Sequence, residues 1–482
     1  MEAATTTAAA TPAAAETEPA APANPLLGTA PPSPAGPIEP GSAPISLPPA
    51  LPGSALRHTI KFGTRPLPYF ARAARELGET FTFPVITRKE TFVLSSHPDH
   101  TKALFRAKPT IAPSATAESP LRPVVGPNSI LTSNGDRHMR QRKLLLPAFH
   151  GDAIARYAEQ ITEVAEREVD SWRVGEQFPL AKRMQAVTLE VIMSGIFGIE
   201  GAPPPGSAER KLRDDTRLFM SLSERPIWNF VELIYAGQLE PHGPLKLVLD
   251  RLDKSYYRVI AERRAIPAAE RGDDVLSLLL EATDDEGQTL SDEELRDELI
   301  SLVLAGHETT ANSLAWTFER LVRTPAAYRD LRDAVRGGDR ADEWVEATIH
   351  EGMRARPVVP LVARRVQVDW RLGDWVVPAG SVVGANIVNT HYRPDLYPRP
   401  YEFLPERFLG VKPGTYTWIP FGGGTRRCLG SALAMAEQRI VLGTIARRVD
   451  LTYADPRPER ERHRNVTMVP REGGRVVVER VL

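Results

Sequence analysis

The only cysteine of the chain, Cys428, lies where a sulfur could do chemistry. It belongs to the run FGGGTRRCLG at Phe421–Gly430, which leads into an amphipathic helical pattern. Backbone N–H groups and the positive end of the dipole at a helix N-terminus stabilise a thiolate, so we expect a nucleophile or a metal ligand. A nucleophile lacks a nearby base, because no histidine lies between His391 and His463. For a ligand, Arg426 would neutralise an anionic group on whatever the sulfur binds. A buried unreactive cysteine fits poorly with three glycines and two arginines beside it.

A long helix is the second candidate for chemistry. Ser291 and Glu294 have the spacing of a capping box, and apolar residues then recur at helical intervals to about Val322, roughly 45 Å along the axis. Its middle, AGHETT at Ala305–Thr310, puts glycine, threonine and glutamate where a buried helix prefers leucine and alanine. Such an exception indicates a functional site, where the two small residues would let a flat ligand lie against the backbone. The alternative is a kinked packing helix.

Two charged clusters lie between this helix and the cysteine. Glu351 and Arg354 stand at i, i+3 on a predicted helix, and the run PERF, which contains Arg407, follows about fifty residues later. Alone, such a pair is most often a solvated surface pair worth a few tenths of a kcal/mol. A zinc protease is excluded on spacing, because His307 begins a run like H-E-x-x-H but the second histidine position holds Ala311.

The elements that must position these groups are mostly helical, with strands near the start and again after residue 356. Thr80–Pro84 and Thr91–Ser95 are β-branched and aromatic runs around a polar connection, which predicts a hairpin. Apolar residues at three- and four-residue intervals predict helices at Ala153–Trp172, Lys211–Leu222 and Leu245–Ile266.

Composition limits the class of protein. The 482 residues carry 60 Lys and Arg against 61 Asp and Glu, and a net charge of −1 excludes a global electrostatic footprint for nucleic acid or a membrane surface. A lone cysteine forbids an intramolecular disulfide and favours the cytoplasm. No apolar run of about 18 residues occurs, so no membrane anchor is expected. The first fifty residues contain 15 Ala, 12 Pro and no Lys or Arg. We therefore expect a disordered Ala/Pro-rich tail over residues 1–54, with a Pro-rich partner ligand as the alternative, and a folded domain over residues 55–482.

In order and spacing, these segments resemble the cytochrome P-450 family of haem-thiolate monooxygenases, and the resemblance covers nearly everything from Ala55 onward. The cysteine run meets every fixed position of the family's Phe-x-x-Gly-x-Arg-x-Cys-x-Gly loop, which is the most specific motif in the chain. The resemblance implies a mainly α fold with a smaller β-rich region, in which haem lies between the long central helix and the cysteine loop.

The resemblance also assigns roles. It makes Cys428 the axial ligand of haem b iron and Arg426 a propionate ligand, and it makes Glu308 and Thr309 the acid and alcohol that deliver protons to the oxygen being reduced. Glu351, Arg354 and Arg407 would form a structural ion-pair triad behind the cysteine loop. The remaining positions implied to lie around the cofactor are His138, Arg142, Ala305, Arg364, Phe421 and Gly430.

Two of these assignments have alternatives. The family often has Trp-x-x-x-Arg where this chain has His138 and Arg142; both could bind a propionate, and a helix-surface role is the alternative. Arg364 aligns with another propionate-binding arginine, but its neighbour Arg365 could be mistaken for it. Guanidinium groups suit this task because they bind carboxylates bidentately.

The chain has no glycine-rich dinucleotide fingerprint and no fused flavin or iron–sulfur segment, so electrons must come from a separate protein. The resemblance implies a ferredoxin and its reductase, drawing indirectly on NAD(P)H. Basic residues expected near the sulfur could dock such an acidic partner: Arg140, Arg142, Lys143 and Arg427.

The leading hypothesis is an O2-dependent monooxygenase that hydroxylates or epoxidises a lipophilic small molecule. The alternatives are a peroxide-driven or isomerising haem-thiolate enzyme and a haem sensor or carrier without turnover. In similar proteins the pocket is lined by the regions corresponding to Pro109–Ile130, Leu218–Ile234 and Val358–Val362, where Arg122 and Arg225 are possible contacts for a carboxylate. His307 is interpreted as a spacer beside the pocket. Fatty acids, terpenoids and polyketide-like molecules all stay open as substrates.

Overall fold

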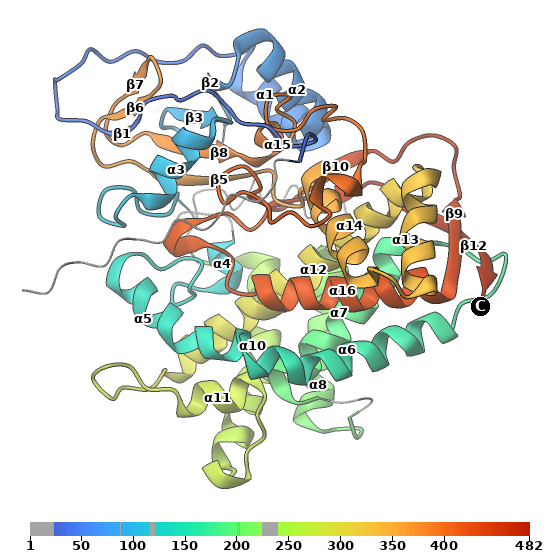
Figure 1. The fold of residues 1–482 in the computed structure, drawn as a ribbon. Helices are drawn as coiled ribbons and strands as arrows, with labels where there is room; N and C mark the ends of the chain where they lie inside the picture. The colour runs from blue at the N-terminus through green and yellow to red at the C-terminus, as the bar shows by residue number, and fades with distance from the viewer. Residues whose placement is uncertain (1–23, 87, 116–120, 200, 202, 224–239) are drawn as a thin grey trace, which may run out of the picture.

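The computed structural model describes residues 24–86, 88–115, 121–199, 201, 203–223 and 240–482. Over these residues the chain is mainly helical with smaller β regions, as the sequence predicts (Figure 1). The helices predicted at Ala153–Trp172, Lys211–Leu222 and Leu245–Ile266 are confirmed with slightly shifted ends. They are α6, α8 and α10 in the list that follows. The helices are α1 (Ala55–Thr64), α2 (Pro66–Leu77), α3 (Pro98–Arg106), α4 (Arg122–Val125), α5 (Gly135–Leu145), α6 (Asp152–Asp170), α7 (Leu180–Phe197), α8 (Ala208–Ser223), α10 (Gly243–Ala265), α11 (Val275–Glu281), α12 (Asp292–Val322), α13 (Pro325–Gly337), α14 (Ala341–Ala355), α15 (Ile387–His391) and α16 (Ser431–Arg448).

Helix α12 is the predicted long central helix. It is continuous over 31 residues, roughly 46 Å, and its capping box is complete: Ser291 accepts from the Glu294 N–H, and the Glu294 carboxylate accepts from the Ser291 N–H. Helix α7 packs closely along α12. The two helices approach so closely at Gly306 that a Cβ there would overlap the Cδ1 atom of Ile192 in α7. The expectation that Gly306 makes room for a flat ligand is therefore wrong, since this glycine makes room for α7.

Helices α6, α7, α12, α14 and α16 share one apolar core, which contains Leu314, Phe318 and Leu442. Ser313 of α12 donates to the Gln438 side chain of α16 at 2.7 Å, and α16 also packs along α6 (Figure 1). Buried packing of this kind tolerates little displacement. The helix that follows the cysteine loop is therefore held in a fixed relation to the AGHETT segment of α12.

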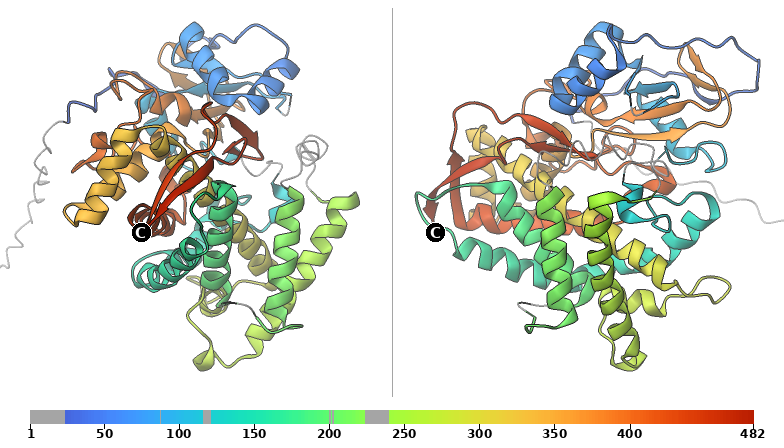
Figure 2. Two further views of the ribbon diagram at one scale, coloured as in Figure 1. Left: turned by 90° about the vertical axis from the view of Figure 1, so that its right-hand side faces the viewer. Right: turned by 180° about the vertical axis from the view of Figure 1, so that it is seen from behind.

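Helices α8 and α10 pack against each other; they lie at the right-hand edge in the left view of Figure 2 and in front of the other helices in the right view. Asp215 of α8 joins them, accepting from Arg251 and Ser255 of α10, both at 2.6 Å. These contacts fix the two helices that flank residues 224–239.

The sheet that contains the predicted hairpin lies with α1, α2 and α3 above the helical part in Figure 1, whereas β9 and β12 lie beside α13. This sheet has the strand order β2-β3-β8-β5, and the predicted hairpin is confirmed, with Thr80 of β2 opposite Ser95 of β3. Strand β8 runs parallel to β3 and antiparallel to β5. The strands are β1 (Ala35–Pro37), β2 (Thr80–Thr82), β3 (Phe92–Ser95), β4 (Gln177–Pro179), β5 (Leu361–Arg365), β6 (Trp370–Leu372), β7 (Trp375–Val377), β8 (Val382–Asn386), β9 (Val449–Tyr453), β10 (Glu461–Arg464), β11 (Thr467–Pro470) and β12 (Arg475–Val481).

The N-terminal segment corrects one expectation. Disorder was predicted for residues 1–54, yet residues 24–54 lie against the folded body: β1 pairs with β6, and the Thr82 N–H donates to the Pro49 carbonyl at 2.8 Å. Proline lacks an N–H but keeps its carbonyl, and its fixed φ lowers the entropy lost on ordering. A Pro-rich segment can therefore be held by donors from distant parts of the chain, which composition does not reveal. Residues 1–23 lie outside the described residues.

Among the described residues, none of the helices combines the length and the apolar character needed to cross a bilayer.

Candidate active site

The cysteine loop is closed by its own backbone. The Cys428 N–H donates to the Phe421 carbonyl at 3.0 Å, and the Gly430 N–H bonds to the Cys428 sulfur. Gly424 has a φ of +67°, and a Cβ there would overlap the carbonyl oxygen of Phe105, so this position requires glycine. Helix α16 begins three residues after the cysteine. Cys428 therefore precedes the helix instead of lying in its first turn, and the loop amides supply the nearest donors.

The surroundings of the Cys428 sulfur indicate an enclosed space beside it. The Cys428 side chain is exposed, yet the protein around it raises the pKa of its thiol above the usual value through burial. Both observations hold together if the exposed surface borders an enclosed space instead of bulk water. The Gly430 N–H, Arg427 and Arg142 act in the opposite direction and lower that pKa. A cation placed on the sulfur would complete the stabilisation of a thiolate.

A cluster of cations lies beside this space. Burial lowers the pKa of Arg364 to about 10, and burial with repulsion from Arg364 and Arg142 lowers the pKa of Arg426 to about 10. The pKa of His138 falls to about 3 through burial and the charges of Arg426, Arg142 and Arg364. Within the described part of the chain, no carboxylate bonds to Arg142, Arg364 or Arg426, which bind backbone carbonyls and the Asn134 amide oxygen. Among the residues that the structure describes, the cluster thus lacks a counter-anion.

Two sets of contacts link this cluster to the cysteine loop and to α12. Arg142 donates to the Arg427 carbonyl at 2.9 Å, and Arg426 donates to the Ile130 carbonyl at 3.0 Å. Just before Ile130, Ser129 hydrogen-bonds Ser301 of α12 at 2.6 Å. The segment 129–134 therefore spans from the cysteine loop to α12, one turn before Ala305.

These residues fit a planar dianion that contains a metal. Ala305 is exposed in the middle of α12, although Val303 and His307 on either side are buried, so an open space lies against this face of the helix. The two carboxylates of haem would meet the unneutralised arginines, and its iron would meet the sulfur. Arg364 is only 8% exposed, while Arg365 points to the other face of β5 and pairs with Glu90 at 2.6 Å. Arg364 is therefore the arginine on the cluster's side.

His138 does not have a surface role, and Arg142 is half-buried. His138 is 3% exposed, and burial lowers the pKa of Arg142. His307 lies in the packing of α12 on α7. Its side chain is buried, with a pKa lowered to about 4 by burial, and Thr188 of α7 donates to its carbonyl at 2.9 Å. The interpretation of His307 as a spacer beside the pocket stays a prediction.

Glu308 and Thr309 are held in place by specific bonds. The Glu308 carboxylate accepts from Arg464 Nε at 2.8 Å and from the Thr467 hydroxyl at 3.1 Å, which come from the β10–β11 hairpin. The Thr309 hydroxyl donates to the Ala305 carbonyl at 2.7 Å. Sequence reasoning missed Arg464 and Thr467, and no local motif marks them because they approach Glu308 from more than 150 residues away.

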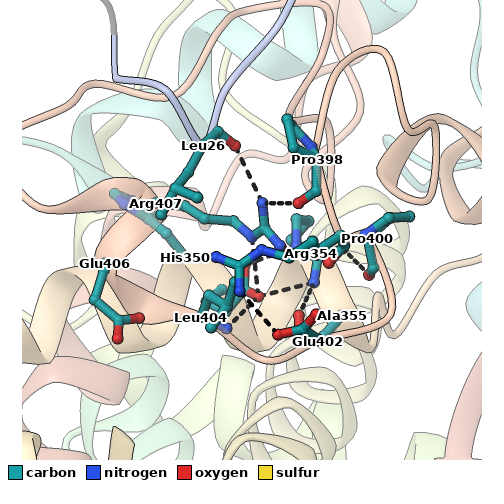
Figure 3. A network of polar contacts seen from close by, with 12 residues as sticks. Leu26, His350, Arg354, Ala355, Pro398, Pro400, Glu402, Leu404, Glu406 and Arg407 are labelled. Atoms are coloured by element: carbon teal, nitrogen blue, oxygen red, sulfur yellow. Dashed lines mark hydrogen bonds and ion pairs between the residues drawn. The ribbon is translucent and has the colours of Figure 1, made fainter.

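The expected triad residues meet in a fully buried network (Figure 3). Arg354 donates to both Glu351 carboxylate oxygens, at 2.6 and 2.8 Å, and to the carbonyls of His391, Pro400 and Glu402. Burial opposes the charge of Arg354, but Glu351 more than offsets it and raises the pKa of this guanidinium. Arg407 Nε lies 3.5 Å from a Glu351 oxygen. This network ties α14 to the segment that leads to the cysteine loop.

Two of the four bases expected to dock a partner, Arg140 and Lys143, are paired within the chain. Arg140 contacts Asp284 at 2.5 Å and Glu294 at 3.1 Å, and Lys143 contacts Asp285 at 2.7 Å. The charges of Arg140 and Lys143 were expected to be available to an acidic protein. They are already offset by Asp284 and Asp285, which lie between α11 and α12, and by Glu294 in the first turn of α12.

Part of the expected pocket lining lies outside the described residues. This applies to residues 116–120 and to 224–239, which include Arg225. Arg122, at the start of α4, is described, and its Nε is buried with no hydrogen-bond partner among the described residues.

Comparisons with known proteins agree with this geometry. The family model described as Cytochrome P450 (hereafter P-450) matches residues 47–477. Putative cytochrome P-450 135B1 of Mycobacterium tuberculosis is 36% identical over 429 residues, which cover 88% of each chain. Putative cytochrome P-450 137 of the same species is 36% identical over 406 residues, 84% of each chain. The solved structure of cyanobacterial CYP120A1 with bound retinoic acid superposes with a TM-score of 0.75 at 22% identity, covering 91% of this chain and 100% of the other. The P450DA haem domain gives 0.74 at 23% identity, covering 91% of this chain and 98% of the other.

The chain belongs to the cytochrome P-450 family of haem monooxygenases. The two structural neighbours show the same fold.

Proposed function

We propose that this chain inserts one oxygen atom from O2 into a lipophilic small molecule, by hydroxylation or epoxidation, with haem b as its cofactor. A ferredoxin and its reductase would supply the electrons from NAD(P)H, in the cytoplasm. The observation that carries the proposal is the cluster of Arg142, Arg364 and Arg426 next to the Cys428 sulfur, for which the described part of the chain supplies no counter-anion.

In this proposal Arg142, Arg364 and Arg426 bind the haem propionates, with His138 packed among them, and Cys428 ligates the iron. Phe421 and Gly430 fix the loop, and Ala305 gives the ring its space against α12. When bound, thiolate-ligated haem supplies O2 activation, since the thiolate donates electron density that favours cleavage of the O–O bond.

The protein's own part in the chemistry is to hold and deliver protons. Thr309 is one turn from Ala305, so its hydroxyl lies beside the proposed oxygen site, and Glu308 supplies a carboxylate one residue away. The bond between Arg464 and Glu308 holds that carboxylate at 2.8 Å from the guanidinium. A lipophilic substrate is supported by the half-buried apolar residues Leu304 and Val362, of which Val362 borders the cysteine loop at Gly422.

A direct test is the carbon monoxide difference spectrum of the purified protein, followed by a ligand screen for shifts of the haem absorption. We expect a thiolate-type band, and lipophilic compounds that perturb the spectrum and stimulate electron consumption. A colourless protein would refute the haem proposal. A protein that binds haem but never consumes electrons in response to a ligand would be a sensor or carrier instead.

Removing the Thr309 hydroxyl should uncouple the reaction. In Thr309→Ala, we expect the product formed per reducing equivalent to fall about tenfold, less than the ~10²–10⁴ of a fully lost proton donor because water remains at the site. Hydrogen peroxide should rise in compensation. Thr317→Ala is the matched control, because Thr317 makes the same bond to the carbonyl four residues earlier in α12, at 2.8 Å. If Thr309→Ala and Thr317→Ala form equal amounts of product per reducing equivalent, the Thr309 hydroxyl does not have the proposed role in proton delivery.

Neutralising Arg427 should slow electron delivery more than neutralising Lys143. Both side chains are exposed, but Asp285 offsets the charge of Lys143, so at long range this pair contributes little to steering an acidic ferredoxin. We expect Arg427→Ala to lower the second-order reduction rate a few-fold at low salt and to flatten its salt dependence. If Lys143→Ala has the larger effect, the partner does not approach over the cysteine loop.

A further inference from the structure

Residues 24–37, here called the N-terminal strap, lie outside the segment that matches the family model, which begins at residue 47. They nevertheless contact the buried network behind the cysteine loop (Figure 3). We infer that the strap is a positioning element for the cysteine loop, acting through Arg407 and through the segment 395–418. The inference rests on the haem-thiolate function proposed above.

The first contact is reciprocal. The Asn24 side chain donates to the backbone carbonyls of Arg407 at 2.9 Å and Glu406 at 3.3 Å. In return, Arg407 Nη1 donates to the Leu26 carbonyl at 3.1 Å. The Leu26 N–H donates to the Asn24 side-chain oxygen at 2.9 Å, which fixes the turn that presents this carbonyl.

Arg407 depends on this carbonyl more than its place in an ion-pair triad suggests. Its side chain is fully buried, and among the described residues its Nε has no hydrogen-bond partner, although a Glu351 oxygen lies 3.5 Å away. Over the same residues the terminal nitrogens are bonded by backbone carbonyls, those of Leu26 and Pro398 at Nη1 and that of Arg399 at Nη2. A buried guanidinium that loses an acceptor bears the full cost of its own desolvation. The strap therefore supplies one of the acceptors that hold the charge of Arg407 in place.

The second contact is a close approach of two backbones. The Gly28 N–H donates to the Leu396 carbonyl at 2.8 Å, and a Cβ on Gly28 would overlap the Asp395 carbonyl oxygen. Leu27 packs beside this point against a core cluster that contains Leu396 and Tyr397. The strap is thus packed closely against the start of the segment 395–418, which leads to the cysteine loop.

This segment connects the strap to the sulfur. Tyr397 donates to the Thr417 carbonyl at 2.9 Å, and Trp418 belongs to the same apolar cluster as Leu27. The Trp418 ring in turn lies 5.9 Å from the ring of Phe421, whose carbonyl closes the cysteine loop. A displacement at Leu27 or Gly28 therefore reaches Cys428 through packed side chains.

The far end of the strap is also fixed. The Ser33 N–H donates to Asp99 at 3.0 Å, its hydroxyl bonds His100 at 2.9 Å, and His97 bonds the Pro31 carbonyl at 2.8 Å. The following residues continue as β1, paired with β6. Because both ends are held, the strap is a brace and not a loose extension.

The sharpest test compares Gly28→Ala with Thr29→Ala in the full haem-loaded chain. The φ of Gly28 lies outside the left-handed region, so alanine there is strained by the overlap with Asp395 and not by its own backbone; Thr29 is its exposed neighbour. We expect Gly28→Ala to lose haem to excess apomyoglobin about fivefold faster than the parent, with part of the carbon monoxide band moving away from the thiolate position. Thr29→Ala should match the parent, and the helical circular dichroism of both should be unchanged.

Asn24→Ala and two truncations provide a second measurement that does not depend on the tolerance of Gly28. Deleting residues 1–23 should leave haem transfer and the band unchanged, whereas deleting residues 1–34 and substituting Asn24 should change both. If none of the strap variants differs from the parent, the brace is refuted while the haem function stands. If the parent itself shows no thiolate band, it is the proposed function that fails.

Discussion

Replacing Cys428 with serine should abolish the thiolate-type carbon monoxide band and substrate-dependent O2 consumption. An alcohol has a far higher pKa than a thiol, so serine cannot supply the anion that the loop N–H and the nearby arginines stabilise. Changing a residue behind a metal ligand typically costs about 10–100-fold, and loss of the ligand itself should exceed this range. Difference spectroscopy and oxygen consumption measure the two effects.

The control for this variant is Thr425→Ala, an exposed residue of the same loop. It should retain both the band and the activity. Because the bond from the residue 428 N–H to the Phe421 carbonyl is made by the backbone, the serine variant should keep the parent's circular dichroism spectrum. A serine variant that keeps the thiolate band would disprove the assignment of Cys428 as the ligand.

Arg354→Ala should destabilise the protein by about 3–5 kcal/mol, because it leaves the Glu351 carboxylate buried without its bidentate partner. The same substitution leaves three backbone carbonyls without a donor, which adds to the loss. We expect most of the variant to be recovered without haem. The free energy of unfolding, measured with urea on the haem-free protein, separates lost stability from lost cofactor.

The same helix provides the matched control. Arg340 and Glu343 form an i, i+3 pair at the start of α14, with side chains 56% and 49% exposed. Such exposed pairs contribute about 0–1 kcal/mol, so Arg340→Ala should leave stability and haem content almost unchanged. If Arg354→Ala and Arg340→Ala lose similar amounts of stability and haem, the buried pair contributes no more to stability than the exposed pair.

The contrast between these two pairs shows how much of the structure short-range sequence spacing can predict. The spacing of Glu351 and Arg354 is that of an ordinary surface pair, and only the order of motifs along the chain indicated that it was buried. The spacing of Ser291 and Glu294, by contrast, determines its own capping box, because both bonds form within one turn of helix.

Other details had no local signal. Gly306 was expected to face a ligand, but α7 occupies that side, since the choice of helix face depends on which neighbour packs there. The partners of Glu308 come from a hairpin near the C-terminus, and the acids that offset Arg140 and Lys143 come from residues 284–294. Each of these contacts joins residues more than 100 positions apart.

The sequence by itself determined the chemical groups: a single sulfur in a glycine-rich loop, an acid and an alcohol in a long helix, and a set of arginines in a fixed order. These follow from residue type and short-range spacing, which the chain carries whatever its fold. The tertiary structure decided which groups meet: that Arg364 and not Arg365 joins the cluster, that Arg464 holds Glu308, and that a proline-rich strap completes the shell of Arg407. The physical reason is that a buried charge must find its partners wherever the fold brings them, and those partners lie far away in sequence.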